Sequence, residues 1–183
     1  MQNAFEKAGA QYDLVRDAEG LRRATKIVLP GVGHFGQMMR ALDALSLRGE
    51  VKSRIAEGVP FFGVCLGLQA LFDGSAEAPE TEGLGVFNGR VERFPDEARV
   101  PHMGWNDIAR VKPSRLFLND ASDQQVYFAH SYYVPICDEA TMVCDYSRPF
   151  TAAVEDGNCF GVQFHPEKSG AAGIEIIRKF VEL

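Results

Sequence analysis

The sequence predicts an α/β fold in which helices cover both faces of an open, mostly parallel sheet, with an antiparallel extension in its second half. In the first half, short apolar runs alternate with stretches of helical periodicity, the pattern of βα units on a parallel sheet. From Gly85 onward the apolar runs become shorter and more closely spaced, as in antiparallel strands. Because no repeat, low-complexity tract or linker interrupts residues 1–183, we expect a single domain.

Three strands and two helical stretches are predicted in the first half. Each strand is a short apolar run, and the third is unbroken, as in a strand buried on both faces. The strands are expected at residues 12–15, 26–30 and 59–65, and the helical stretches at residues 35–58 and 66–74.

The second half is predicted to begin with a hairpin at residues 85–94, because Asn88-Gly89 is a two-residue turn signal. Further strands are expected at residues 125–134, 142–147, 150–156 and 159–164. Residues 169–183 have helical periodicity and should close on the sheet through one apolar face, formed by Ile174, Ile177 and Val181.

Composition narrows the classes of function. The net charge of -6, with charges of both signs interspersed, disfavours nucleic acid and anionic membranes as partners. No apolar run approaches the roughly 20 residues of a membrane span, and no signal peptide precedes the first strand, so we expect a cytoplasmic protein. The four cysteines lack C-x-x-C or metal-ligand spacing, so we expect no disulfides and no metal site. No cofactor is expected either.

Cys65 lies between Gly63 and Gly67, where a buried strand is predicted to meet a helix. Small residues on both sides of a nucleophile permit the sharp turn called a nucleophile elbow. The helix N-terminus would also favour a thiolate. Alternatively, Cys65 is a buried structural thiol and the glycines only allow close packing of strand and helix.

A thiolate nucleophile needs a base, and His165 has a carboxylate two residues away, at Glu167. Along an extended chain these side chains project to the same side, so Glu167 can orient the imidazole. A surface His-Pro-Glu turn is the alternative. The other histidines have no such partner and are interpreted as structural or peripheral: His34, His102 and His130.

An acyl intermediate also needs oxyanion donors, and a Gly-rich turn follows the strand predicted at residues 26–30. Gly31 and Gly33 let the peptide of Val32 rotate and present its N–H, while the Leu66 N–H is a second candidate. A turn with only a topological role is the alternative. The segment lacks the residues of a P-loop and the spacing of G-x-G-x-x-G.

The motifs GVCLGLQ, from Gly63, and FHPEKSG, from Phe164, resemble those of the class I, or triad, glutamine amidotransferases. Within that class, PGVGHF, VPHMGWN and YFAHSYY make the chain similar to the glutaminase subunits of imidazole glycerol phosphate synthases. The resemblance covers nearly the whole chain. It implies a flavodoxin-like sheet and glutamine hydrolysis through a thioester on Cys65, with His165 and Glu167 completing the triad.

The resemblance also implies a binding pocket and a partner. The residues expected to line the glutamine pocket are Gly31, Gly33, Gln69, Ser131 and Tyr132. Ammonia would pass to a (β/α)8 cyclase subunit, in a heterodimer that makes imidazole glycerol phosphate and AICAR for histidine synthesis. The residues expected to face that cyclase are Trp105, Asn106 and Lys168. Gly104 and Asn106 indicate that Trp105 lies on a loop, although a lone tryptophan is more often in the core.

One departure from the family is expected at the N-terminus. Family members begin with a strand and a Gly-rich turn, whereas this chain starts within the helix that follows them. In the order 2-1-3-4-5 that strand would pair with residues 12–15 and 26–30, so without it the chain should aggregate or close the gap between the two. Two other functions stay open: a stand-alone hydrolase of γ-glutamyl substrates, and an interaction subunit without catalysis.

Overall fold

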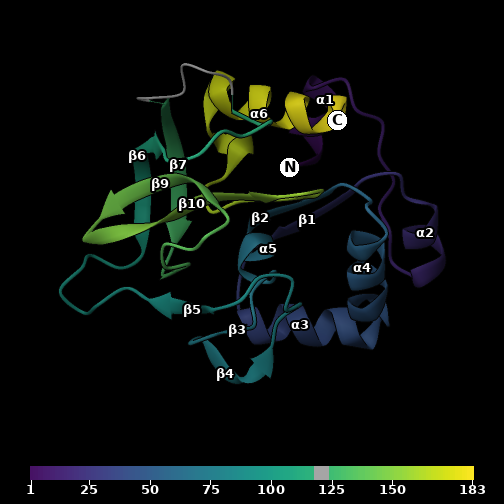
Figure 1. Ribbon diagram of the computed structural model, residues 1–183, viewed down its shortest axis with the longest axis horizontal. Helices are drawn as coiled ribbons and strands as arrows, with labels where there is room; N and C mark the ends of the chain where they lie inside the picture. Colours follow the sequence, from purple (N-terminus) through teal and green to yellow (C-terminus); the bar gives the residue numbers. More distant parts are fainter. Residues whose placement is uncertain (118–123) are drawn as a thin grey trace.

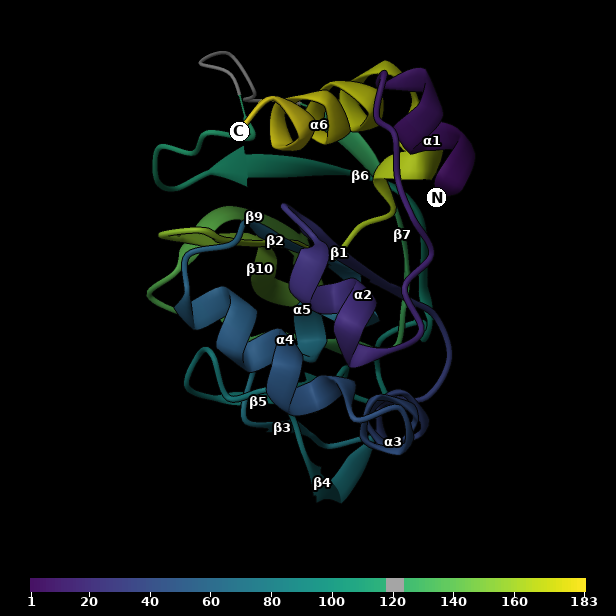
Figure 2. The same cartoon turned by 90° about the vertical axis from the view of Figure 1, so that its right-hand side faces the viewer.

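The computed structural model describes residues 1–117 and 124–183. Within these ranges the main sheet has seven strands, and helices lie on both of its faces (Figures 1 and 2), which confirms the α/β prediction. In spatial order the strands are β1 (Ile27–Gly31), β2 (Phe61–Cys65), β11 (Cys159–Val162), β10 (Arg148–Asp156), β9 (Ala140–Tyr146), β6 (His102–Arg110) and β7 (Gln124–His130).

The sheet has a parallel part and an antiparallel extension. β2 pairs in parallel with β1 and with β11, and the remaining pairs are antiparallel. Every residue of β2 is buried, as expected for an unbroken apolar run. β2 lies between β1 and β11, so its last residue, Cys65, lies at the carboxyl end of the parallel part.

Helices cover opposite faces of the sheet (Figure 2), with a hydrophobic core on each face. One face is covered by α1 (Gln2–Lys7) and α6 (Gly170–Glu182), and Phe180 of α6 stacks on Phe62 with ring centroids 5.1 Å apart. The other face is covered by α2 (Ala18–Arg23), α3 (Phe35–Ala44), α4 (Leu47–Ala56) and α5 (Leu66–Gln69). None of the described helices is long and apolar enough to cross a membrane.

The predicted hairpin at Asn88-Gly89 is wrong. β5 (Arg90–Arg93) pairs in parallel with β3 (Gly74–Ser75) and antiparallel with β8 (Tyr132–Tyr133) instead of with the residues before the turn. The Gly89 N–H donates to the Asp73 carboxylate at 2.8 Å, and the Asp73 N–H donates to the Gly89 carbonyl at 3.0 Å. The turn therefore fastens a loop to Asp73. The small sheet has the order β4 (Ala78–Glu82), β3 (Gly74–Ser75), β5 (Arg90–Arg93), β8 (Tyr132–Tyr133).

The strand predicted at residues 12–15 is also wrong, because these residues form neither a helix nor a strand. Leu14 is 66% exposed and Tyr12 is 40% exposed. A strand forms only where a neighbour satisfies its backbone groups, and β1 lies at the sheet edge with β2 as its partner among the described strands. Residues 12–15 and β1 do not pair, so the expected closure between them is wrong as well.

Other boundaries shift for local reasons. The helical stretch at residues 35–58 divides into α3 and α4 because Ser46 adopts a left-handed conformation with φ 56°. α5 ends at Gln69 rather than near residue 74. On α6 the fully covered apolar residues are Ile176, Ile177 and Phe180, while Ile174 and Val181 are only half-buried.

Trp105 lies on β6, paired with Tyr127 of β7, so the predicted loop at this position is wrong. Gly104 has φ 139°, yet the strand continues through it because β7 supplies a ladder partner at every position of residues 102–108. The tryptophan is 54% exposed, which also excludes the core alternative. β6 therefore presents Trp105 on a sheet face.

Candidate active site

The site is built around the junction between β2 and α5. Cys65 ends the strand, Leu66 begins the helix, and Cys65 has φ 54° and ψ -106°. A positive φ is rare for a residue with a side chain and costs about 1–3 kcal/mol. The sharp turn predicted from the motif is therefore present, and it places the strain on the cysteine.

The flanking glycines serve close packing. A Cβ on Gly63 would lie 2.5 Å from the Gly67 carbonyl oxygen, and a Cβ on Gly67 would lie 1.8 Å from the Leu29 carbonyl oxygen. Neither glycine has a positive φ. The glycines thus let strand and helix approach closely, as in the packing alternative, and the same junction contains the sharp turn at Cys65 that the elbow prediction requires.

His165 and Glu167 lie beside the elbow, just beyond the end of β11. His165 Nδ1 and Glu167 Oε1 are 3.0 Å apart, and both side chains are largely buried. The His165 N–H donates to the Tyr127 carbonyl at 2.8 Å, and the Ser169 hydroxyl donates to the His165 carbonyl at 2.7 Å. The Tyr127 N–H in turn donates to that hydroxyl at 3.0 Å, so Ser169 ties the His-Glu turn to β7. The sequence reading missed this role of Ser169.

The imidazole is held in its charged form. Burial lowers the pKa of His165, but contacts with Cys65 and with the Glu167 carboxylate outweigh burial and raise it to about 9. Burial opposes ionisation of Glu167 too, yet its bond to His165 leaves its pKa lowered. His165 Nε2 is buried and makes no hydrogen bond among the described residues. Since Nδ1 is engaged by Glu167, Nε2 is the nitrogen that can exchange a proton with Cys65 or a substrate.

Gln69 lies one helical turn beyond Cys65 and is 4% exposed. Its Nε2 donates to the Tyr132 carbonyl at 2.9 Å and to Gln163 Oε1 at 3.0 Å. Gln163 Nε2 then donates to Cys65 Sγ at 3.7 Å. Sequence reasoning missed Gln163, although an extended chain projects residues 163 and 165 to the same side and so signals it. Ser131 and Tyr132, adjacent on the chain, are half-buried.

The predicted oxyanion segment lies next to the elbow. Gly31 is the register partner of Cys65 across β1 and β2, and a Cβ on Gly31 would lie 2.9 Å from Leu66 Cβ. Val32 is 82% exposed, and Gly33 has φ 102° with open space around it. Gly31 is thus required for close approach, and the peptides that follow it are unobstructed.

The remaining histidines have structural contacts. His34 Nδ1 accepts a hydrogen bond from the Gly36 N–H at 3.1 Å and caps α3. His102 Nδ1 and His130 Nε2 lie 3.0 Å apart. Burial lowers the pKa of His102 to about 4 and that of His130 to about 3, so both rings are neutral. No group of three metal-ligating side chains occurs among the described residues.

The residues predicted to face a partner divide into two groups. Trp105 packs edge-on against Tyr127, with ring centroids 6.2 Å apart, and Lys168 Nζ lies 5.4 Å from the centre of the Tyr127 ring. We call Trp105, Tyr127 and Lys168 the aromatic patch. Asn106 is half-buried and donates to the Asp145 carbonyl at 3.2 Å, so its side chain is engaged within the fold.

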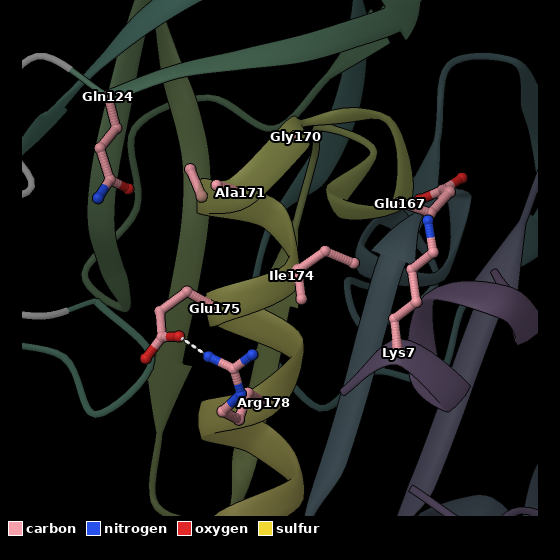
Figure 3. A pocket seen from close by; sticks show the side chains of 9 residues that line it. Lys7, Gln124, Glu167, Gly170, Ala171, Ile174, Glu175 and Arg178 are labelled. Carbon is pink, nitrogen blue, oxygen red and sulfur yellow. Dashed lines mark hydrogen bonds and ion pairs between the residues drawn. The ribbon is translucent and has the colours of Figure 1, made fainter. Parts of the chain in front are cut away.

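A groove of about 700 Å³ lies on the outer side of Glu167 (Figure 3). Glu167 is on its wall, Lys7 extends toward Glu167, and Glu175 pairs with Arg178 to the left of them. The lining residues are Lys7, Gln124, Glu167, Gly170, Ala171, Ala172, Ile174, Glu175 and Arg178. Neither Cys65 nor any residue of the predicted glutamine pocket is among them, so this groove is not the expected substrate site.

Comparison with known proteins agrees with this geometry. The family "Glutamine amidotransferase class-I" matches residues 2–183. A protein of Methanothermobacter thermautotrophicus named "Imidazole glycerol phosphate synthase subunit HisH" is 46% identical over 99% of this chain and 90% of its own length. The Geobacillus kaustophilus protein of the same name is 42% identical over 99% and 89%. A solved "Crystal structure of glutamine amidotransferase" has a TM-score of 0.77 at 21% identity, over 99% of this chain and 90% of that one, and supports the fold.

Proposed function

Because the chain belongs to the class I glutamine amidotransferase family, we propose that it hydrolyses glutamine to glutamate and ammonia as the glutaminase subunit of an imidazole glycerol phosphate synthase. One observation carries the proposal: Cys65 is held at positive φ on a strand-helix elbow beside a buried, ion-paired His165. Cys65, His165 and Glu167 form the triad. This combination provides a nucleophile, a proton carrier and a group that orients the carrier.

In the acylation step, the Cys65 thiolate attacks the side-chain amide carbon of glutamine. The C–N bond breaks, and the leaving nitrogen takes a proton from His165 Nε2 to depart as ammonia. The ion pair with Glu167 keeps the imidazole charged until it gives up that proton, consistent with the pKa of about 9. The product is a γ-glutamyl thioester on Cys65.

In the deacylation step, water attacks the thioester while the now neutral His165 takes the water proton. The C–S bond breaks, glutamate leaves, and the thiolate-imidazolium pair is restored. The N–H groups of Val32 and Leu66 stabilise the oxyanion in both steps. Gly31 lets β1 approach the elbow closely and Gly33 lies in open space, so both can border the bound substrate; the register of Gly31 with Cys65 supports this role. Gln69, Ser131 and Tyr132 form the opposite wall of the pocket.

The ammonia is passed to a cyclase subunit, in a heterodimer that forms imidazole glycerol phosphate and AICAR for histidine biosynthesis. The names of the two curated relatives, which are subunits of such a synthase, support this assignment. The exposed aromatic patch supports a docking role on the face that carries Trp105 and Lys168, beside the triad turn. We place the reaction in the cytoplasm, where the four free cysteines remain reduced.

The test is Cys65→Ala in the complex with a cyclase subunit. Glutamine-dependent synthesis should disappear, while synthesis from added ammonia should persist, because only the thioester step needs the sulfur. A folded variant that still hydrolyses glutamine would refute Cys65 as nucleophile. Measuring hydrolysis by the wild-type chain with and without cyclase separates the alternatives: full activity alone indicates a stand-alone hydrolase, and none in either state indicates a binding subunit.

A further inference from the structure

A continuous chain of polar contacts runs from β6, past the buried rings of Phe94 and Phe128, to Cys65. Its outer part joins Asn106 Nδ2 to His102 Nε2 at 3.5 Å, His102 Nδ1 to His130 Nε2 at 3.0 Å, and His130 Nδ1 to the Tyr132 carbonyl at 2.8 Å. Its inner part is the pair Gln69 and Gln163, which leads to Cys65 Sγ. In the proposed hydrolysis the sulfur is the only one of these groups that reacts, and Gln69 and Tyr132 serve there only as pocket walls.

The direction of every bond in the inner part is fixed by the Tyr132 carbonyl. A carbonyl only accepts, so Gln69 must turn its amide nitrogen toward it, and that same nitrogen also donates to Gln163 Oε1. With its oxygen engaged by Gln69, Gln163 presents its own nitrogen to Cys65 Sγ. Gln163 is fully buried, so no water competes for that amide. The sulfur thus faces an obligatory N–H donor.

We propose that Gln163 is a further catalytic residue, which donates an amide hydrogen bond to the Cys65 thiolate, and that Gln69 positions it. The proposal rests on the proposed function for its role in turnover. A hydrogen bond from an amide to a charged acceptor is stronger than one to a neutral acceptor, so this contact favours the thiolate over the thiol. Gln163 and His165 approach the sulfur from the same strand end, and each stabilises the same ionised nucleophile.

The outer part of the chain holds the carbonyl in place. His130 must donate through Nδ1 to the Tyr132 carbonyl, so its Nε2 accepts from His102 Nδ1, and the remaining His102 nitrogen accepts from Asn106. Two neutral rings satisfy this arrangement, and burial keeps both neutral. Asn106 directly follows Trp105 on β6, so the chain begins beside the aromatic patch.

The experiment measures the rate at which iodoacetamide alkylates Cys65 at neutral pH in the full chain, without glutamine or partner. Gln163→Met keeps the length of the side chain and removes the donor, so we expect the rate to fall about tenfold. The other thiols react little because burial raises the pKa of Cys137, Cys144 and Cys159, and Cys65→Ala measures their remainder. A rate in folded Gln163→Met within about twofold of the wild type would overturn the proposal.

A reversal test addresses the positioning role. Gln69→Glu replaces the donor by a carboxylate, so Gln163 should turn its nitrogen to that carboxylate and its oxygen to the sulfur, and alkylation should fall by a similar factor. Because both changes act through one amide, Gln69→Glu combined with Gln163→Met should be no slower than Gln163→Met; additive effects would refute the coupling. Thr141→Val is the matched control, since it removes a buried hydrogen bond to the Ala153 carbonyl elsewhere and should leave alkylation unchanged. As alkylation needs no glutamine, the result stands apart from the proposed glutaminase activity.

Discussion

Cys65 keeps a strained conformation because its neighbours leave no other. Its register partner Gly31 contacts the start of α5, and Gly63 and Gly67 bring the strand and helix backbones within van der Waals distance of each other. Relaxing Cys65 to an ordinary φ would have to move two buried elements. Strain of this kind persists only where surrounding packing is worth more than its cost of about 1–3 kcal/mol.

The His165 pair predicts how stability depends on pH. The folded-state pKa of about 9 lies above the unfolded value of about 6.5, so its contribution is complete below pH 6.5 and is lost as pH rises toward 9. Glu167 has a lowered pKa, so its contribution is present above its unfolded value and is lost in acid. Urea unfolding across this range should show the free energy of unfolding declining between about pH 6.5 and 9. The decline should shrink in Glu167→Gln; an unchanged slope in that variant would contradict the assignment.

Gly33 predicts a separable effect on catalysis. At φ 102° a side chain is strained even though nothing lies within 4 Å, so Gly33→Ala should distort the peptide that presents the Val32 N–H. Loss of one oxyanion donor lowers kcat by about 10² to 10³. Gly58→Ala is the matched control, because Gly58 also has a positive φ, 89°, in open space but lies far along the chain. Equal kcat in the two variants would show that the loop is only a turn.

At the scale of elements, sequence patterns succeeded where burial alone shapes a segment. The buried run at β2, the elbow and α6 follow from local composition, and all were predictable. The prediction of a strand at residues 12–15 was wrong because a strand also needs a neighbouring strand to pair with, and hydrophobic periodicity does not show whether one is present. The prediction of a hairpin at Asn88-Gly89 was wrong because the Gly89 N–H bonds to the carboxylate of Asp73, which is remote in sequence. The sequence indicates that the side chain of Gln163 projects to the same side as that of His165. It does not indicate the hydrogen bond to Gln69, which lies 94 residues away along the chain.

The position of Trp105 on β6 leads to a prediction about binding to the cyclase subunit. Trp105 is 54% exposed and packs edge-on against Tyr127, so Trp105→Ala should leave the melting temperature of the isolated chain nearly unchanged. If the aromatic patch is the docking surface, the same change should weaken cyclase binding by more than about 1 kcal/mol. Val111→Ala, at an equally exposed apolar position just after β6, is the control and should not affect the titration. Unimpaired binding by Trp105→Ala would show that the aromatic patch is not the docking surface.

At the scale of the molecule, helices cover both faces of the sheet, but β1 has no strand on its outer side among the described residues. Parallel strands are normally buried on both faces and paired on both sides. β2 satisfies this, whereas Pro30 of β1 is exposed and Val28 and Leu29 are half-buried. β1 carries Gly31 and the proposed oxyanion segment directly at its end, so looseness at this edge would be transmitted to the catalytic centre.

The last prediction concerns that edge. A strand of family type fused before Met1 should pair with the outer side of β1, because the backbone groups there have no ladder partner among the described strands. Each backbone hydrogen bond that the added strand makes should contribute about 0.5–1.5 kcal/mol, and several together are a large share of the roughly 5–15 kcal/mol that stabilises a domain. The extension should therefore raise the melting temperature and soluble yield, and, by fixing Gly31 against Cys65, raise glutamine turnover in the presence of cyclase. An extension of equal length with proline at alternate positions cannot form the ladder and serves as control. Equal melting temperature and turnover in the two fusions would show that β1 is already stable as an edge strand.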